Sequence, residues 1–133
     1  MALDFKSAWT DIEDTSAAME DVCRRIAHPS PSCVFFYCSP KYDLEALARG
    51  INERFDCPVM ACTTAGEIVP HLGYVEGGLA GASLSPPDLK VVQGAIPDVH
   101  KFDNTSAHEM TKRLSDRLGG ECGPGERRFG LVL

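Results

Sequence analysis

The fold is decided by the stretch Cys33–Cys38, which reads CVFFYC and is apolar throughout. A strand that is covered on both faces has this pattern. Asp43 is expected to cap a helix that continues to Phe55, with apolar residues at helical spacing. Pro58–Ala61 is a second short apolar run, and its residues Val59–Ala61 are expected to form another buried strand. Two strands joined by one helix pair in parallel, so their carboxyl ends meet at one edge of a sheet. The sequence therefore predicts an α/β fold, a mixed β-sheet with flanking helices.

Two further elements are predicted ahead of this pair. Phe5–Thr10 alternates loosely and fits an edge strand. Thr15 or Ser16 is expected to cap a helix that Pro29 ends. The apolar residues at helical spacing, which we expect on its buried face, are Met19, Val22, Cys23 and Ile26.

The middle of the chain predicts a loop and then a hairpin. Ile68–Gly78 contains one proline and three glycines, as expected of a loop or a short irregular strand. Leu79–Leu84 and Leu89–Ile96 flank the turn signal Pro86-Pro87-Asp88. Two short strands around such a turn favour an antiparallel hairpin.

A third helix and a last strand are predicted beyond the hairpin. Asn104–Ser106 opens the helix, and Ser106 with Glu109 fits a capping box. The expected buried face of this helix is Met110, Leu114 and Leu118. Phe129–Leu133 then has the pattern of an apolar strand. An unpaired strand edge can pair with another chain, so we expect self-association through this run or through the hairpin.

The composition favours one globular domain, residues 1–133, and excludes a nucleic-acid surface. The chain has 133 residues, with 13 Lys and Arg against 19 Asp and Glu, and a net charge of −6. Nucleic-acid binding requires clustered positive charge. Residues 1–14 lack the basic start and apolar core of a signal peptide. No apolar run reaches the ~20 residues of a membrane span. We therefore expect a cytoplasmic protein that does not enter a membrane.

The six cysteines do not have the spacing of a disulfide framework or a zinc site. Cys33, Cys38 and Cys62 lie in or beside apolar runs, where a free cysteine behaves as a small hydrophobic residue. Free structural thiols are therefore expected. A nucleophilic Cys38 or Cys62 is an alternative, but it requires a positioned base, and no histidine lies near either one in the sequence.

The two strand ends predict a candidate ligand site. Cys38, Ser39 and Lys41 follow the first strand, and Cys62-Thr63-Thr64-Ala65-Gly66-Glu67 follows the second. Threonine hydroxyls donate and accept hydrogen bonds, and Gly66 permits close approach to the backbone. Lys41 can pair with a carboxylate or phosphate, and Glu67 can accept from an ammonium group. A tight turn in which the threonines bond their own backbone is the alternative interpretation.

Other site signals are weak. No histidine pair has the spacing of metal ligands, and no glycine-rich phosphate motif occurs. His71 is the best placed of the histidines to enter the candidate site, because it lies in the loop after Glu67.

Three blocks, Phe35–Leu44, Ala61–Ile68 and Gly73–Gly78, resemble the N-terminal half of a FIST domain, named for F-box and intracellular signal transduction. The Cys-Thr-Thr-Ala-Gly-Glu block is the most specific of the three. The resemblance implies a sensory domain for a small ligand, with amino acids proposed. It also implies signalling partners such as histidine kinases or cyclic-dinucleotide enzymes, and haem in members that resemble nitric oxide sensors. A full family member is longer, so the chain is expected to be a fragment of the N-terminal domain.

The resemblance and the residues together predict a sensory domain that binds a small molecule and is not an enzyme. No cofactor is required by the sequence. The alternatives are a haem-based nitric oxide sensor, a protein-interaction platform and a thiol enzyme.

Overall fold

The computed structural model describes residues 4–85, 89–96, 98–119, 123 and 125–132. The chain forms two compact units, Met1–Leu89 and Lys90–Leu133. The first unit contains the β-sheet and two helices, and the second contains one long helix with the extended segments on either side of it. The predicted α/β fold with a mixed sheet is confirmed.

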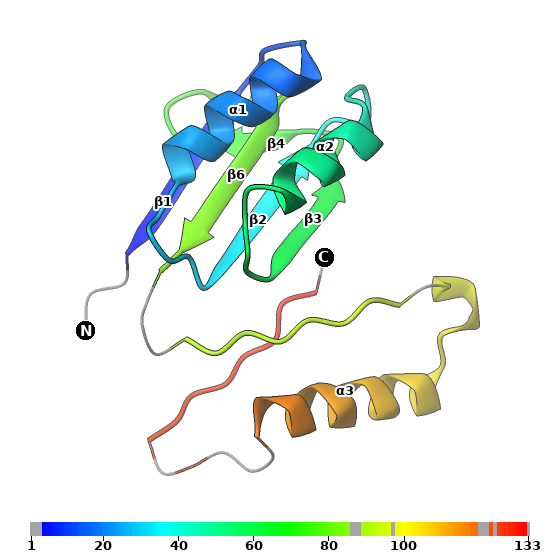
Figure 1. The fold of residues 1–133 in the computed structure, drawn as a ribbon. Coiled ribbons are helices and arrows are strands. Elements are labelled where there is room, and N and C mark those ends of the chain that lie inside the picture. Colours follow the sequence, from blue (N-terminus) through cyan, green and yellow to red (C-terminus); the bar gives the residue numbers. More distant parts are fainter. Residues whose placement is uncertain (1–3, 86–88, 97, 120–122, 124, 133) are drawn as a thin grey trace. The chain divides into compact units, whose positions relative to one another are not determined.

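The sheet of the first unit has four strands. They are β1 (Phe5–Thr10), β2 (Cys33–Cys38), β3 (Val59–Thr63) and β6 (Leu79–Leu84), in the order β1-β6-β2-β3 (Figure 1). β2 and β3 pair in parallel, as the sequence predicts, and β6 is antiparallel to both of its neighbours, β1 and β2. The carboxyl ends of β1, β2 and β3 therefore lie at the same edge as the amino end of β6.

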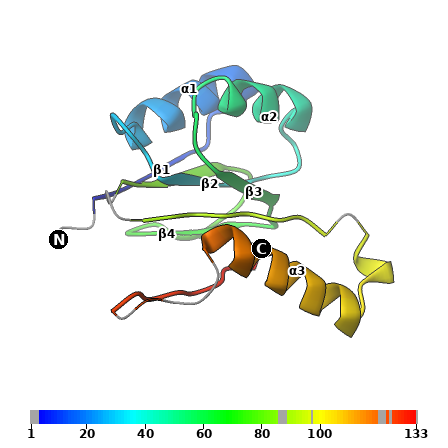
Figure 2. The ribbon, with the colours of Figure 1, turned by 60° about the horizontal axis from the view of Figure 1, so that its bottom comes forward.

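Two helices lie over one face of this sheet, α1 (Thr15–Ile26) and α2 (Leu44–Asn52) (Figures 1 and 2). The Asp43 carboxylate caps α2 by accepting from the Ala46 N–H at 3.0 Å, as expected. The expectation that Thr15 or Ser16 caps α1 is wrong. Asp14 does so, because its carboxylate reaches the Ala17 N–H at 2.8 Å.

The core lies between the helices and this face of the sheet. Val22 and Ile26 of α1 and Val34 and Phe36 of β2 are completely buried in it. Gly81 of β6 lets α1 approach, because a Cβ atom at this position would lie 2.5 Å from Cγ1 of Val22. The interior strand therefore requires a residue without a side chain here.

Two sequence expectations about burial need correction. Cys33 is buried, but Phe35 and Tyr37, on the face of β2 away from the helices, are only half-buried. β3 is an edge strand rather than a buried one, with Met60 half-buried and Ala61 exposed. Because β3 pairs only with β2 among the described strands, its other edge is open and its residues stay partly exposed.

A small hairpin follows β3. Its strands are β4 (Glu67–Val69) and β5 (Gly73–Val75), paired antiparallel. Figure 2 shows β4 on the side of the sheet opposite to the helices. Three large apolar side chains on this hairpin are exposed: Ile68 at 87%, Leu72 at 60% and Tyr74 at 61%.

The predicted hairpin of Leu79–Leu84 with Leu89–Ile96 is wrong. β6 pairs with β1 on one side and β2 on the other, so neither of its edges is free for a further strand or for self-association. No strand forms within residues 89–96, and Pro86-Pro87-Asp88 lies outside the described residues. Pairing with two strands distant in sequence takes the place of the local hairpin.

The second unit contains a short 3₁₀ helix, Val99–Lys101, and α3 (Asn104–Leu118). The predicted capping box of Ser106 with Glu109 is wrong, because Asp103 caps the helix instead. Its carboxylate accepts from both the backbone N–H and the hydroxyl of Ser106, each at 2.8 Å. Gly119 ends α3 in the left-handed region at φ 107°. The residues expected on the buried face of α3 are all half-buried: Met110, Leu114 and Leu118.

The C-terminal run forms no strand within its described part, residues 129–132. Phe129 is 85% exposed and Val132 is 89% exposed. The predicted strand is therefore wrong for these residues. Self-association through this run stays a prediction.

Candidate functional site

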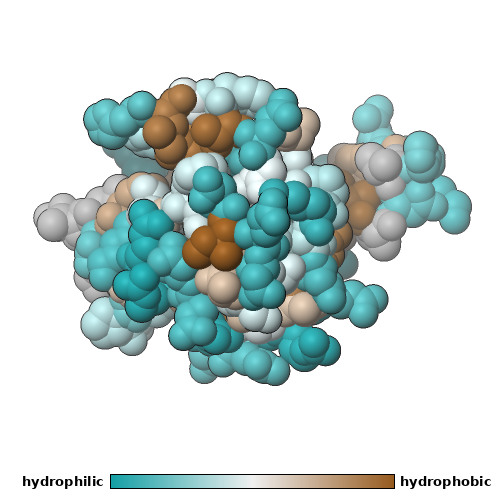
Figure 3. All heavy atoms as spheres, turned by 90° about the horizontal axis from the view of Figure 1, so that it is seen from above, coloured by the Kyte–Doolittle hydropathy of each residue, from teal (hydrophilic) through white to brown (hydrophobic). Residues whose placement is uncertain are grey.

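The carboxyl edge of the sheet joins the loops that the sequence singles out. The Thr64 N–H donates to the carbonyl of Cys38 at 2.9 Å, so the turn after β3 is tied to the end of β2. The Ser39 N–H donates to the carbonyl of Gly78 at 2.9 Å, so the loop after β2 is tied to the start of β6. Figure 3, the view from above, shows a mainly hydrophilic surface with a few groups of apolar atoms.

Glu67 is the most unusual residue at this edge. Its side chain is only 7% exposed. Its Oε1 accepts from the hydroxyl of Thr64 at 2.6 Å, but its Oε2 is buried without a hydrogen-bond partner among the described residues. Buried polar atoms in native structures are nearly always paired. Thr64 thus fixes one carboxylate oxygen and leaves the other available.

Tyr42 and Cys38 lie around this carboxylate. Tyr42 is 3% exposed, and its hydroxyl donates to the carbonyl of Ile12 at 2.8 Å. Burial raises the pKa of Tyr42, and negative charges that include Glu67 raise it further. Burial is also the main cause that raises the pKa of the Cys38 thiol, with contributions from Cys62 and Glu67. Both groups are therefore kept neutral, as donors rather than nucleophiles.

The raised pKa of Cys38 argues against this thiol as a catalytic nucleophile. Burial raises the pKa of Cys23 to about 11 and raises the pKa values of Cys33 and Cys57 as well. A catalytic cysteine requires the opposite shift. The five described cysteines are free, and Cys122 lies outside the described residues.

Trp9 also presents an unpaired polar atom. Its Nε1 is buried without a partner among the described residues. Gly78 lies against it, since a Cβ atom at Gly78 would be 2.3 Å from Nε1. Sequence reasoning did not include Trp9 in the site. Its position at the carboxyl end of β1 was the available signal, but only the strand order brings that end to this edge.

Lys41 and Gly66 border the same edge. The Lys41 side chain is exposed, with its Nζ 5.8 Å from the centre of the Tyr42 ring. A Cβ at Gly77, where φ is +81°, would lie 3.0 Å from that Nζ. At Gly66 a Cβ would lie 2.6 Å from the Tyr74 ring, whose hydroxyl donates to the carbonyl of Ala65 at 3.3 Å. Tyr74 thus covers the turn that precedes Glu67.

The remaining predicted site residues are less closely involved. Thr63 is exposed on β3, and Cys62 is half-buried with its carbonyl 3.9 Å from Sγ of Cys38. His71 is exposed in the β4–β5 turn at φ 71°. The chemistry of haem is controlled by an enclosed pocket, which an exposed imidazole in a turn does not provide. His71 therefore does not fit a haem site. The described residues contain no group of three or more His, Cys, Asp or Glu that could hold a metal ion.

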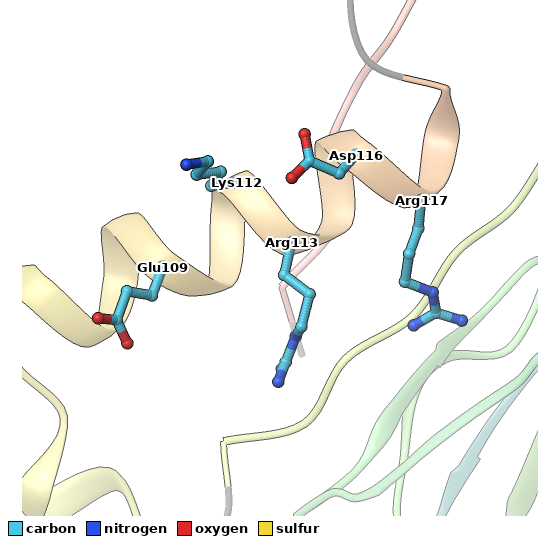
Figure 4. A pocket seen from close by; sticks show the side chains of 5 residues that line it. All are labelled: Glu109, Lys112, Arg113, Asp116 and Arg117. Carbon is cyan, nitrogen blue, oxygen red and sulfur yellow. The ribbon is translucent and has the colours of Figure 1, made fainter.

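A separate hollow of about 470 Å³ lies along α3 (Figure 4). Five charged side chains line it: Glu109, Lys112, Arg113, Asp116 and Arg117. All five are exposed, and both signs of charge are present. Arg117 donates to the carbonyl of Gln93 at 2.8 Å. This surface has the character of a solvated helix face, without a buried polar group to select a ligand.

A family comparison identifies the fold family. The model of the FIST N domain matches residues 32–133. The chain belongs to this family. FIST domains are sensory domains of signal transduction. Searches of curated proteins and of solved structures gave no match. The FIST match begins after α1, so β1 and Trp9 lie ahead of it.

Within the described part of the chain, no helix is long and apolar enough to cross a membrane.

Proposed function

We propose that this FIST domain senses a small molecule with an ammonium group, of the amino-acid type, at the carboxyl edge of the sheet. The observation that carries the proposal is the buried and unpaired Oε2 of Glu67. Leaving a buried acceptor unpaired costs ~1–3 kcal/mol, and more if the group is charged. A ligand ammonium group would supply the missing donor.

The neighbouring groups suit the other end of such a ligand. The Lys41 ammonium is exposed at the same edge and can pair with a carboxylate. The hydroxyl of Thr64 holds Glu67 in place, so that Thr64 positions the carboxylate rather than binding the ligand. The raised pKa of Cys38 fits a wall of the site and not a reactive group.

The Glu67 carboxylate is enclosed, so ligand entry requires the β4–β5 hairpin to shift. This hairpin has only three residues in each strand and exposes Ile68, Leu72 and Tyr74. A segment with few buried apolar contacts opens locally at low free energy. Its movement on binding would also give the domain a signal to transmit. We propose a cytoplasmic setting and a signalling partner such as a histidine kinase or a cyclic-dinucleotide enzyme.

Calorimetric titration with the standard L-amino acids tests this function. Glu67→Gln places a donor where the ligand ammonium needs an acceptor. We expect it to weaken binding about 10- to 100-fold, the equivalent of ~1.5–3 kcal/mol for a hydrogen bond to a charged group. Glu20→Gln, on the exposed surface of α1, is the matched control. Failure of every amino acid to bind, or equal binding by Glu67→Gln, would contradict the proposal.

A second pair of variants separates positioning from contact. Thr64→Ala removes the hydroxyl that holds Glu67, and we expect it to weaken binding about 3- to 10-fold. Thr63→Ala removes an exposed hydroxyl from the preceding residue and should leave binding unchanged. Equal effects of the two variants would assign the role to the turn as a whole.

A protein-interaction platform is the second candidate function. It is favoured by one observation, the exposed apolar side chains of Ile68, Leu72 and Tyr74 on one small hairpin. A variant with all three replaced by serine should then lose its partner while keeping its amino-acid affinity. Loss of both activities would instead tie the hairpin to ligand binding.

A further inference from the structure

We propose that Trp9, which lies ahead of the FIST match, donates its indole N–H to the carboxylate of the ligand. The inference rests on the proposed function and extends its site by a residue that the family match does not include. Its basis is that Nε1 of Trp9 is buried without a partner among the described residues. An indole N–H can only donate, so it requires an acceptor.

The two unpaired atoms complement each other. Trp9 offers a donor, and Oε2 of Glu67 offers an acceptor. A zwitterion such as an amino acid carries one group for each. Neither atom has a hydrogen-bond partner among the described residues, and a single ligand of this class would supply both.

Backbone contacts connect the two residues along one edge. Gly78 lies against Trp9, and its carbonyl accepts from the N–H of Ser39. The carbonyl of Cys38, the residue before Ser39, accepts from the N–H of Thr64. The hydroxyl of Thr64 in turn donates to the carboxylate of Glu67. Each step is a direct contact between neighbouring segments at the carboxyl ends of the strands.

The direction of the Trp9 side chain fits the same location. Its neighbours Ala8 and Thr10 are buried, and Ala8 belongs to the core under the helices. Because side chains alternate along a strand, Trp9 faces the opposite side of the sheet. Figure 2 shows β4, which begins at Glu67, on that side.

The strand pairing holds Trp9 firmly. Trp9 is opposite Ala80 of β6, and Ala80 is opposite Tyr37 of β2. The small alanine between two aromatic side chains leaves space for the indole ring. Arg25 of α1 donates to the carbonyl of Trp9 at 2.8 Å, which fixes the backbone from the other face.

The third unpaired buried atom does not belong to this site. Nε2 of His28 has no partner among the described residues, but Nδ1 of the same ring lies 3.2 Å from the carboxylate of Asp4. Asp4 immediately precedes β1, so this pair lies at the opposite edge of the sheet. Only Trp9 and Glu67 share the carboxyl edge.

Trp9 is the single tryptophan of the chain, so its fluorescence reports directly on the proposed contact. The probes are the standard L-amino acids and, for each one that binds, the corresponding amine without the carboxylate. We expect the amino acid to shift the Trp9 emission. Calorimetry should show that Trp9→Phe weakens amino-acid binding about 5- to 10-fold and leaves amine binding unchanged. Glu67→Gln should weaken the binding of both probes.

A second variant protects the test against misfolding. Trp9→3-benzothienylalanine keeps the shape of the indole and replaces only the N–H by sulfur, so it should reproduce the selective loss. Normal amino-acid affinity in both Trp9 variants would overturn the role of Trp9 and leave the proposed function intact. Equal weakening of amino-acid binding and amine binding would have the same consequence. Absence of amino-acid binding in the unmodified protein would overturn both.

Discussion

The two units of the chain use their apolar residues in different ways. In Met1–Leu89, side chains from two helices and three strands of the sheet are completely or nearly completely buried in one core. In Lys90–Leu133, α3 has no buried residue, and Phe102, Phe129, Leu131 and Val132 are all exposed. The first unit is therefore held by contacts between segments far apart in sequence. In the second, α3 contacts the segment before it, for example through the hydrogen bond from Arg117 to the carbonyl of Gln93, but it buries none of its residues.

This difference explains where the candidate site lies. A site with buried, unpaired polar atoms needs rigid surroundings that enclose them, and only long-range packing supplies these. The carboxyl edge of the sheet has that support from β1, β2, β3 and β6. The charged hollow on α3 is lined by exposed side chains. Variants in matched positions of the two units can test the contrast.

The largest expected difference is between Phe36 and Leu114. Phe36 is completely buried, so Phe36→Ala should lower the free energy of unfolding of the first unit by ~3–5 kcal/mol. Leu114 is only half-buried on α3, so Leu114→Ala should cost less than half as much. Denaturant titration followed by Trp9 fluorescence reports on the first unit, and far-UV circular dichroism reports on both. An equal effect of Leu114→Ala on Trp9 fluorescence would show that the units unfold together.

Two glycines offer a sharper comparison. A Cβ at Gly81 would lie 2.5 Å from Cγ1 of buried Val22, whereas a Cβ at Gly94 would lie 2.7 Å from Sδ of Met110, in a long flexible side chain. Gly81→Ala should therefore destabilise the first unit by ~1–3 kcal/mol through overpacking. Gly94→Ala should be close to neutral, because Met110 can move aside. Thermal unfolding of both variants provides the measurement, and a neutral Gly81→Ala would mean that α1 can shift away from the sheet.

The sequence predicted the parts of the fold that depend on neighbouring residues. The strand Cys33–Cys38, the helix capped by Asp43 and the parallel pairing of β2 with β3 are all found. The meeting of Cys38 with Thr64 follows from that pairing. A short apolar run, a cap and a connecting helix specify these features locally, so no distant contact has to be known.

The parts that were not predicted depend on strand order. Leu79–Leu84 reads equally well as half of a local hairpin and as an interior strand, and the choice is made by its pairing with β1 and β2. A glycine such as Gly81 inside a strand indicates that another element approaches closely, but the sequence does not show that this element is α1. The pairing of β6 with β1 also brings the end of β1 to the edge that holds the site. Because this strand order could not be predicted, Trp9 was not included in the predicted site. The binding roles of the predicted site residues stay predictions.

The smallest expected effect concerns the cap of α3. The Asp103 carboxylate accepts two hydrogen bonds from Ser106, and these lower its pKa below the ordinary value of 3.8. A carboxyl group with a lowered pKa in the folded state stabilises that state above its unfolded pKa. The contribution is lost as the pH falls through the lower, folded pKa. The last described helix should therefore fray at its amino end only in strong acid.

Asp103→Asn separates the charge from the cap, because asparagine caps helices as well as aspartate but does not titrate. The Ser106 amide resonance should titrate below pH 3.8 in the unmodified chain and stay constant in Asp103→Asn. Asp103→Ala should lose the protection of this amide against hydrogen exchange at every pH, whereas the α2 amides capped by Asp43 should be unaffected. Titration of Ser106 at or above the ordinary aspartate pKa would contradict the cap. A matching change in α2 would contradict the view that α3 is stabilised locally, because a purely local cap cannot reach a helix of the other unit.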